Sequence, residues 1–277
     1  MYKTIIVHVD ADDPGSANRV TLATGLAADC HATLIGVAAA LPQVTVALLA
    51  TGAAAVAAGA MPRDAHDLDE KFAVAQSEFV RWTEGTPVQT AWRTAIDFPA
   101  QALAAMSTRA DLVIVGPARR SSPDNGYLDY GDLVMCAGRP VLIVPQGVTK
   151  LDLATAVVAW RNTRESRRAL SDALPLLAMA GNVNLIHVRE KRDDADEATS
   201  LNDAAELLDS HCITAIPKVI DAGRLSPGAR VLEFATRAGA GLLVSGAYGH
   251  TRVRERIFGG VTRDLLANCP IPCLFSR

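Results

Sequence analysis

Residues Thr4–Val37 read TIIVHVDADDPGSANRVTLATGLAADCHATLIGV, and residues Thr155–Val188 read TAVVAWRNTRESRRALSDALPLLAMAGNVNLIHV. Both stretches run from an apolar segment through a polar turn and a helix-length amphipathic stretch to a second apolar segment. Matched without a gap, this pattern predicts two copies of one folding unit. The copies differ most at the turns where an α/β domain places its ligand, so the question is which half carries a working site.

Apolar runs alternate with helix-length segments along the whole chain. Strands are predicted near 3–9, 32–37, 88–93, 111–116 and 140–145, and again near 155–160, 182–188, 215–220, 241–245 and 272–276. Helices are predicted near 16–29, 64–84, 98–108 and 128–137, and again near 164–180, 196–210, 227–238 and 259–268. Continuous apolar runs such as Leu112–Val115 are typical of parallel strands covered on both faces. Strands separated by helices imply right-handed crossovers, and thus an α/β fold with a parallel sheet in each half.

Length and composition indicate two ordinary domains, at 1–147 and 152–277, in a chain of 277 residues. The formal net charge of −3 gives no overall field that would attract nucleic acid. The first residues lack a signal-peptide pattern, and five cysteines do not predict a disulfide framework, so we expect a cytoplasmic protein. The uncharged stretch 32–62 is too rich in Ala, Gly and Pro for a membrane span, and its 38–62 part is a candidate partner surface. Cys269 and Cys273, in CPIPC, are interpreted as the lead into the last strand rather than as a metal or redox site.

A glycine-rich segment follows the fourth strand of the second half. It reads Gly246-Ala-Tyr-Gly249-His-Thr-Arg-Val-Arg-Glu-Arg-Ile-Phe-Gly259-Gly260-Val261-Thr262. Glycines let backbone N–H groups approach an anion closely, and the helix that starts here adds unpaired donors and a positive dipole end. The segment is therefore a candidate phosphate cradle, although glycines that only end a strand and begin a helix remain an alternative.

The spacing Gly-x2-Gly-x9-Gly resembles the ATP-binding signature of the universal stress protein family, except that Gly260 stands where that signature usually has Ser or Thr. The opening IIVHVD resembles the family's first strand, and GRPVLIVP and CPIPCLFS resemble its last strand. The chain is thus identified as a tandem member of this family. The resemblance implies a five-stranded parallel sheet in the order 3-2-1-4-5, with helices on both faces, in each half. It also implies a pseudo-dimer in which strands 141–145 and 272–276 associate.

The resemblance also implies which residues hold a ligand. In nucleotide-binding members, an Asp after the first strand contacts the adenosine, a residue ending the second strand lies beside the base, and the glycines hold the phosphates. Arg161 stands at the position of that Asp in the second half and can only donate hydrogen bonds, so we expect it to reach a phosphate or stack on the base. The ligand implied is ATP or another phosphorylated molecule, with Mg²⁺ left open. Its expected contacts are Gly246, Gly249, His250, Gly259, Gly260, Val261, Thr262, Arg161 and Val188.

The first half carries the family's Asp, at Asp10, but not its glycine loop. Arg119 stands in place of the second glycine, and Tyr127 and Leu128 stand in place of the last two. We expect bulky side chains to block this half, with Tyr127 and Tyr130 filling the failed pocket.

The function that follows is a cytoplasmic stress-response protein that acts as a ligand-responsive binding or signalling module. A slow ATPase or phosphoryl-transfer enzyme, and a scaffold that binds no nucleotide, remain alternatives, as does a homodimer. The acidic run Asp10, Asp12 and Asp13 favours a helix start over a divalent-ion site. No Ser-His-Asp set, carboxylate pair or metal-ligand cluster stands out in the sequence, so no catalytic or metal-binding residue is predicted.

Overall fold

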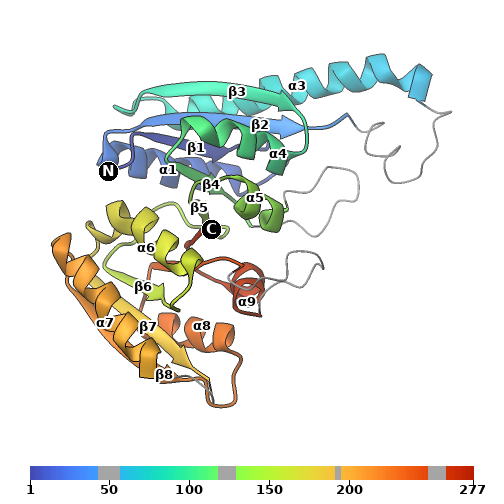
Figure 1. Ribbon diagram of the computed structural model, residues 1–277. Helices are drawn as coiled ribbons and strands as arrows, with labels where there is room; N and C mark the ends of the chain where they lie inside the picture. The colour runs from blue at the N-terminus through green and yellow to red at the C-terminus, as the bar shows by residue number, and fades with distance from the viewer. Residues whose placement is uncertain (43–56, 118–128, 191–194, 249–259) are drawn as a thin grey trace. The chain divides into compact units, whose positions relative to one another are not determined.

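The computed structural model describes residues 1–42, 57–117, 129–190, 195–248 and 260–277 (Figure 1). The chain divides into two compact units, Met1–Gly138 and Arg139–Arg277. Each unit is a largely parallel sheet with helices on both faces, which confirms the predicted α/β fold. None of the described helices is both long and apolar enough to cross a bilayer.

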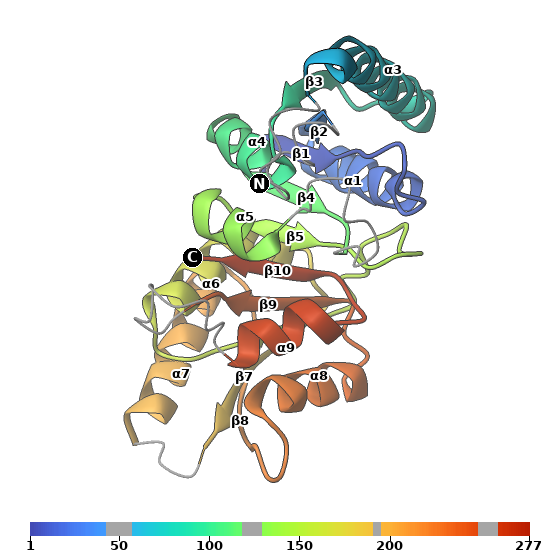
Figure 2. The same ribbon diagram turned by 90° about the vertical axis from the view of Figure 1, so that its right-hand side faces the viewer.

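The first unit contains four strands in the order β3-β2-β1-β4, all parallel where their pairing is described. Helices α1 and α3 pack together, as do α4 and α5 (Figures 1 and 2). The elements are β1 (Thr4–His8), α1 (Ser16–Cys30), β2 (Thr33–Ala40), α3 (Ala57–Thr83), β3 (Thr90–Ile96), α4 (Pro99–Met106), a 3-10 turn (Ser107–Arg109), β4 (Leu112–Val115) and α5 (Tyr130–Cys136).

The second unit contains six strands in the order β5-β10-β9-β6-β7-β8. Its last five strands repeat the expected order 3-2-1-4-5, and β5 pairs antiparallel with β10. The elements are β5 (Val141–Ile143), β6 (Thr155–Ala159), α6 (Arg164–Leu177), β7 (Asn182–Arg189), α7 (Ala195–Ser210), β8 (Ala215–Asp221), α8 (Pro227–Arg237), β9 (Leu242–Gly246), α9 (Gly260–Asn268) and β10 (Cys273–Ser276).

The central strands form because their apolar runs are covered on both faces. All four residues of β4 are fully buried, as are Leu242, Leu243 and Val244 in β9. Several helices begin where a side chain satisfies the first free backbone N–H groups. Thr163 accepts a hydrogen bond from the Ser166 N–H at 3.3 Å ahead of α6, and Ser226 accepts one from the Ala229 N–H at 3.2 Å ahead of α8.

The gapless match between the two halves is wrong beyond the first turn. Thr4 pairs with Thr33 across β1 and β2, whereas Thr155 pairs with Asn182 across β6 and β7. The second connection is therefore two residues shorter than the first. Asp10 and Arg161 remain equivalent, since both lie two residues after their strands, but Val188 corresponds to Ala39 rather than to Val37. The difference lies in the turn, where α6 starts directly after its Thr163 cap.

Candidate functional site

A cavity of about 310 Å³ opens at the carboxyl ends of β6, β7 and β9 in the second unit. The first turn of α9 closes one side of it, and the first turns of α6 and α8 close others. In an open parallel sheet this edge is where ligands bind. The lining, called the site cavity below, consists of Ala159, Trp160, Arg161, Thr163, Glu165, Ser166, Ile186, His187, Val188, Glu190, Pro227, Val231, Ser245, Gly246, Gly260, Val261 and Thr262.

Residues predicted from distant segments of the sequence meet in this cavity. Arg161, Val188, Gly246 and the helix start Gly260–Thr262 all line it. Gly249, His250 and Gly259 were also predicted, and they lie outside the described residues. The strand ends and the helix start therefore converge as the sequence required.

The two described glycines play different parts. A Cβ added to Gly246 would lie 2.6 Å from the backbone carbon of Glu165 and 2.6 Å from the nitrogen of Ser166. A Cβ added to Gly260 would meet no atom of the described residues within 4 Å. Gly246 is thus required because the end of β9 contacts the first turn of α6, whereas no described residue crowds the Cβ position of Gly260.

Thr262 supports the turn after β9. Thr262 is only 4% exposed, and its hydroxyl oxygen accepts a hydrogen bond from the Tyr248 N–H at 3.3 Å. Tyr248 has a φ of 62°, in the left-handed region where a non-glycine residue is uncommon. The hydroxyl therefore helps to hold an unusual backbone turn at the mouth of the site cavity.

Arg161 lies beside an acidic residue that the sequence reasoning missed. Its Nη1 is 3.6 Å from Oε1 of Glu190, which directly follows β7, and both side chains are about half exposed, at 44% and 50%. An ion pair this long and this exposed contributes little to stability. The guanidinium can therefore turn toward a ligand at small cost, and the Glu190 carboxylate can accept hydrogen bonds where Arg161 cannot.

Two other lining residues, on either side of the turn after β6, were also missed. Glu165, in the first turn of α6, is 7% exposed, and its carboxylate pairs with Arg164 at 3.1 Å. Trp160 directly follows β6 and donates from its indole nitrogen to the Ser200 hydroxyl at 3.2 Å. The signal was available in the sequence: both residues flank the turn at which Arg161 was identified.

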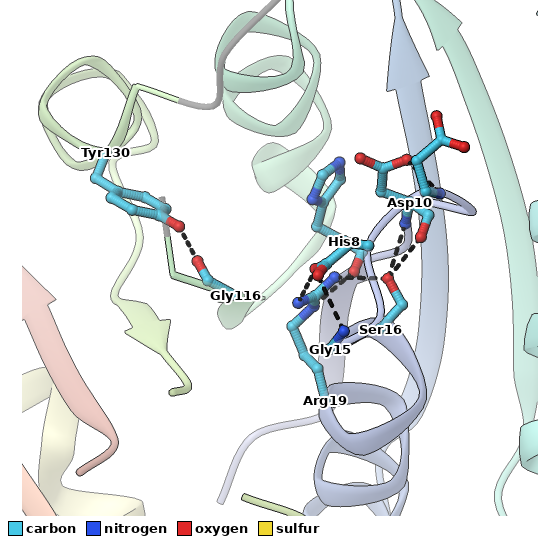
Figure 3. A network of polar contacts seen from close by, with 9 residues as sticks. His8, Asp10, Gly15, Ser16, Arg19, Gly116 and Tyr130 are labelled. Carbon is cyan, nitrogen blue, oxygen red and sulfur yellow. Dashed lines mark hydrogen bonds and ion pairs between the residues drawn. The ribbon is translucent and has the colours of Figure 1, made fainter. Parts of the chain in front are cut away.

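In the first unit, a buried arginine lies at the ends of β1 and β4, the strands that correspond to β6 and β9 of the site cavity (Figure 3). Arg19 projects from α1 and is 2% exposed. Its Nε donates to the carbonyl oxygen of His8 at 2.9 Å, its Nη1 to Oδ2 of Asp13 at 2.8 Å, and its Nη2 to the hydroxyl of Ser16 at 2.9 Å. Every nitrogen of the guanidinium thus has a partner, from the end of β1, from the turn that follows it or from the first residue of α1.

This guanidinium fills the space beside the end of β4. A Cβ on Gly116, the residue after β4, would lie 2.0 Å from Nη1 of Arg19. The buried Tyr130 hydroxyl donates to the Gly116 carbonyl oxygen, and Figure 3 shows both partners. Tyr130 therefore packs where the sequence placed it, whereas Arg119, Tyr127 and Leu128 lie outside the described residues. The buried Arg19 was not anticipated.

The acidic run after β1 forms ion pairs and turn hydrogen bonds. Nζ of Lys71 lies 2.7 Å from Oδ2 of Asp12 and 3.4 Å from Oδ1 of Asp10. Burial is the largest single effect on Asp10 and opposes its ionisation, but Lys71, His8 and the hydrogen bond from the Asp12 N–H together lower the pKa of this carboxyl. Asp13 accepts from the Gly15 N–H at 3.0 Å ahead of α1. Among the described residues, no group of His, Cys, Asp and Glu side chains is arranged to hold a metal ion.

Comparisons with known proteins show which proteins share this fold. Residues 154–277 match the model of the universal stress protein family. A universal stress protein from Archaeoglobus fulgidus DSM 4304 aligns with 99% of this chain and 96% of its own, at a TM-score of 0.74 and 15% identity. A functionally unknown protein from Pseudomonas aeruginosa PAO1 aligns with 99% of this chain and 92% of its own, at a TM-score of 0.60 and 14% identity. No curated protein matches this chain. At these identities the solved structures establish the fold across both halves.

Proposed function

Because residues 154–277 belong to the universal stress protein family, we propose that the second half of this chain binds ATP or another phosphorylated ligand in the site cavity. Binding there makes the protein a ligand-responsive module of a stress response. One observation carries the proposal: six residues predicted as ligand contacts, from four separate segments, line one cavity. Its volume of about 310 Å³ lies at the lower end of the range found for small-molecule sites.

The phosphates belong at the start of α9. This helix begins at Gly260, so the N–H groups of its first turn lack partners within the helix and point toward the cavity end. The helix dipole adds a partial positive charge at the same place. Within the described part of the chain nothing crowds Gly260, which favours the approach of an anion to its backbone. A phosphate group fits these features better than a neutral ligand does.

The base belongs at the apolar side of the cavity. Ile186 and Val188 come from β7, and Val231 comes from α8. Burying a flat ring against these side chains removes apolar surface from water on both partners. Val188 corresponds to Ala39 of the first half rather than to Val37, but this change of counterpart does not affect the apolar side of the cavity, because Val188 itself lines it.

The ribose belongs between Arg161 and Glu190. A carboxylate accepts hydrogen bonds from ribose hydroxyls, which a guanidinium cannot do. Glu190 lies close to Arg161, at the edge where the family's Asp would stand. Glu190 thus supplies the acceptor that the exchange of Asp for Arg161 removes, while Arg161 stays available for a phosphate. A bound Mg²⁺ would be held by the phosphates in this arrangement.

Calorimetric titration of the purified protein with ATP tests the proposal. Gly260→Val should weaken binding about tenfold or more, since the added side chain stands between the anion and the backbone donors of α9. Gly25→Val is the matched control, because a Cβ at Gly25 in α1 also meets nothing within 4 Å and lies in the other unit. Equal ATP affinity in wild type and Gly260→Val would refute the site.

We further propose that the protein is cytoplasmic and that its two halves form a pseudo-dimer, and we leave open whether it is a monomer or a homodimer. The antiparallel pairing of β5 with β10 supports the pseudo-dimer.

Mass spectrometry of protein purified without added nucleotide separates the functional alternatives. Retained ATP supports a binding module, retained ADP with phosphate release supports a slow ATPase, and failure to bind added nucleotide supports a scaffold.

A further inference from the structure

The turn at the proposed ribose end of the site cavity carries opposite charge in the two halves of the chain. From the end of β1 into the first turn of α1, residues 9–19 contain three aspartates and one arginine, a net charge of −2. Figure 3 shows one of these aspartates, Asp10. From the end of β6 into the first turn of α6, residues 160–167 contain three arginines and one glutamate, a net charge of +2. The second half thus attracts an anionic group at a place where the first half repels one.

Two neighbouring elements hold the backbone of the turn after β6. The Trp160 N–H donates to the Ile186 carbonyl oxygen of β7 at 2.8 Å. The Asn162 N–H donates to the Glu197 carboxylate of α7 at 3.3 Å. Arg161 lies between these two anchored residues, and its side chain is 44% exposed. The backbone of Arg161 is therefore fixed before a ligand arrives, which lowers the cost of ordering it, while its guanidinium stays within reach of a ligand.

The guanidinium of Arg161 lies on the side of the cavity away from α9. Strand β6 stands between β9 and β7 in the sheet. The start of α9 is tied to the end of β9, since the Tyr248 N–H donates to the Thr262 hydroxyl at 3.3 Å. Arg161 points the other way, because its Nη1 lies 3.6 Å from Oε1 of Glu190, the residue after β7. A phosphate that meets Arg161 is therefore a different one from the phosphates at the start of α9.

The charges around this turn leave Arg161 able to bind an anion. The Glu165 carboxylate, which lines the cavity, is paired with Nη2 of Arg164 at 3.1 Å. Nη1 of Arg167 donates to the Asn162 side-chain oxygen at 2.6 Å, which keeps a further positive charge beside the turn. The ion pair of Arg161 is long and exposed, so little free energy is lost when the guanidinium leaves it.

We propose that the site cavity selects nucleotides that carry a phosphate on the 2′ or 3′ oxygen of the ribose in addition to a 5′-phosphate. The inference rests on the proposed function and specifies its ligand class. Arg161 donates two N–H groups to the ribose phosphate, and the Glu190 carboxylate accepts a hydrogen bond from the neighbouring hydroxyl. In dinucleotide sites an acidic residue binds the ribose hydroxyl, and an arginine accommodates a ribose phosphate. The difference between Asp10 and Arg161 in this chain follows the same chemistry.

Calorimetric titration of the full chain tests the selection with AMP, adenosine 2′,5′-bisphosphate and adenosine 3′,5′-bisphosphate. AMP is the reference because it lacks only the ribose phosphate. We expect at least one bisphosphate to bind about tenfold to a hundredfold more tightly than AMP, as charge-assisted hydrogen bonds to a phosphate allow. The bisphosphate that binds more tightly identifies the oxygen that is recognised.

Variants test the role of Arg161. Arg161→Gln should remove the gain of the bisphosphate over AMP, and should weaken the binding of AMP itself by less. The matched control is Arg189→Gln, because Arg189 belongs to the same unit, is also exposed and pairs with Asp221 at 2.8 Å. This control should keep the full gain. A gain that survives in Arg161→Gln would overturn the assignment of the ribose phosphate to Arg161.

The titrations also separate this inference from the proposed function. If ATP binds and Gly260→Val weakens it, but neither bisphosphate binds more tightly than AMP, the site stands and the selection for a ribose phosphate is wrong. If neither ATP nor a bisphosphate binds, both proposals are wrong. Tighter binding of a bisphosphate, lost in Arg161→Gln and kept in Arg189→Gln, supports both.

Discussion

Gly246 and Gly260 line the same cavity, yet alanine at the two positions should have opposite effects on stability. Neither glycine has a left-handed φ, so backbone strain does not enter the comparison. An alanine at 246 places its Cβ 2.6 Å from backbone atoms of both Glu165 and Ser166. Backbone atoms cannot rotate away as the end of a long side chain can. The first turn of α6 must therefore shift, and overpacking of this kind costs about 1–3 kcal/mol.

Among the residues that the structure describes, none comes within 4 Å of the Cβ of an alanine at 260, and this residue is the first of α9. Alanine favours a helix over glycine by up to about 1 kcal/mol, and by less at a helix end. The free energy of unfolding should thus stay the same or rise slightly. Urea unfolding followed by far-ultraviolet circular dichroism measures both variants against wild type. Equal losses in the two variants, or a neutral Gly246→Ala, would contradict the packing argument.

Three further predictions concern buried charge and the ligand. Burial, helped by Arg19, lowers the pKa of His8 from 6.5 to about 4. The unfolded chain therefore takes up this proton first, and stability should fall by up to about 3 kcal/mol between pH 6.5 and 4. His8→Asn should flatten that dependence in urea melts, and an unchanged slope would exclude His8 as its source. Arg19→Met leaves the Asp13 carboxylate buried beside an apolar chain and should cost about 3–5 kcal/mol, against about 1 for Lys71→Met; similar unfolding midpoints would contradict this. Arg161→Gln should weaken ATP binding in calorimetry while moving the free energy of unfolding by less than about 0.5 kcal/mol, since the side chain is 44% exposed.

The fold was predictable because its signal is local. Runs such as Leu112–Val115 read as buried parallel strands, and the helix-length segments between them fixed the α/β class. The convergence of Arg161, Val188 and Gly260 also followed from the sequence, since the carboxyl ends of parallel strands meet at one edge of a sheet. Where the strand order is regular, position along the chain predicts position in space.

Features that depend on contacts between distant segments were not predictable. An arginine in the first turn of an amphipathic helix reads as exposed, and nothing near Arg19 in the sequence shows that Gly116 leaves room for its guanidinium. The connection from β6 to β7 is two residues shorter than the connection from β1 to β2. This difference was hidden because both turns are polar and a gapless match still placed apolar residues on apolar residues. The role of Glu190 needed the distance to Arg161, which the sequence does not give.

The antiparallel strand β5 has a consequence for how this gene could be split. Val141–Ile143 are encoded before the second repeat begins, yet they cover the outer edge of β10 in the second unit. A fragment that starts at residue 154 would expose the N–H and C=O groups of that edge to solvent or to another chain. A fragment that starts at residue 139 would keep them covered. A protein that begins at the repeat boundary would thus be prone to self-association through the exposed edge of β10. In the full chain, β5 covers this edge.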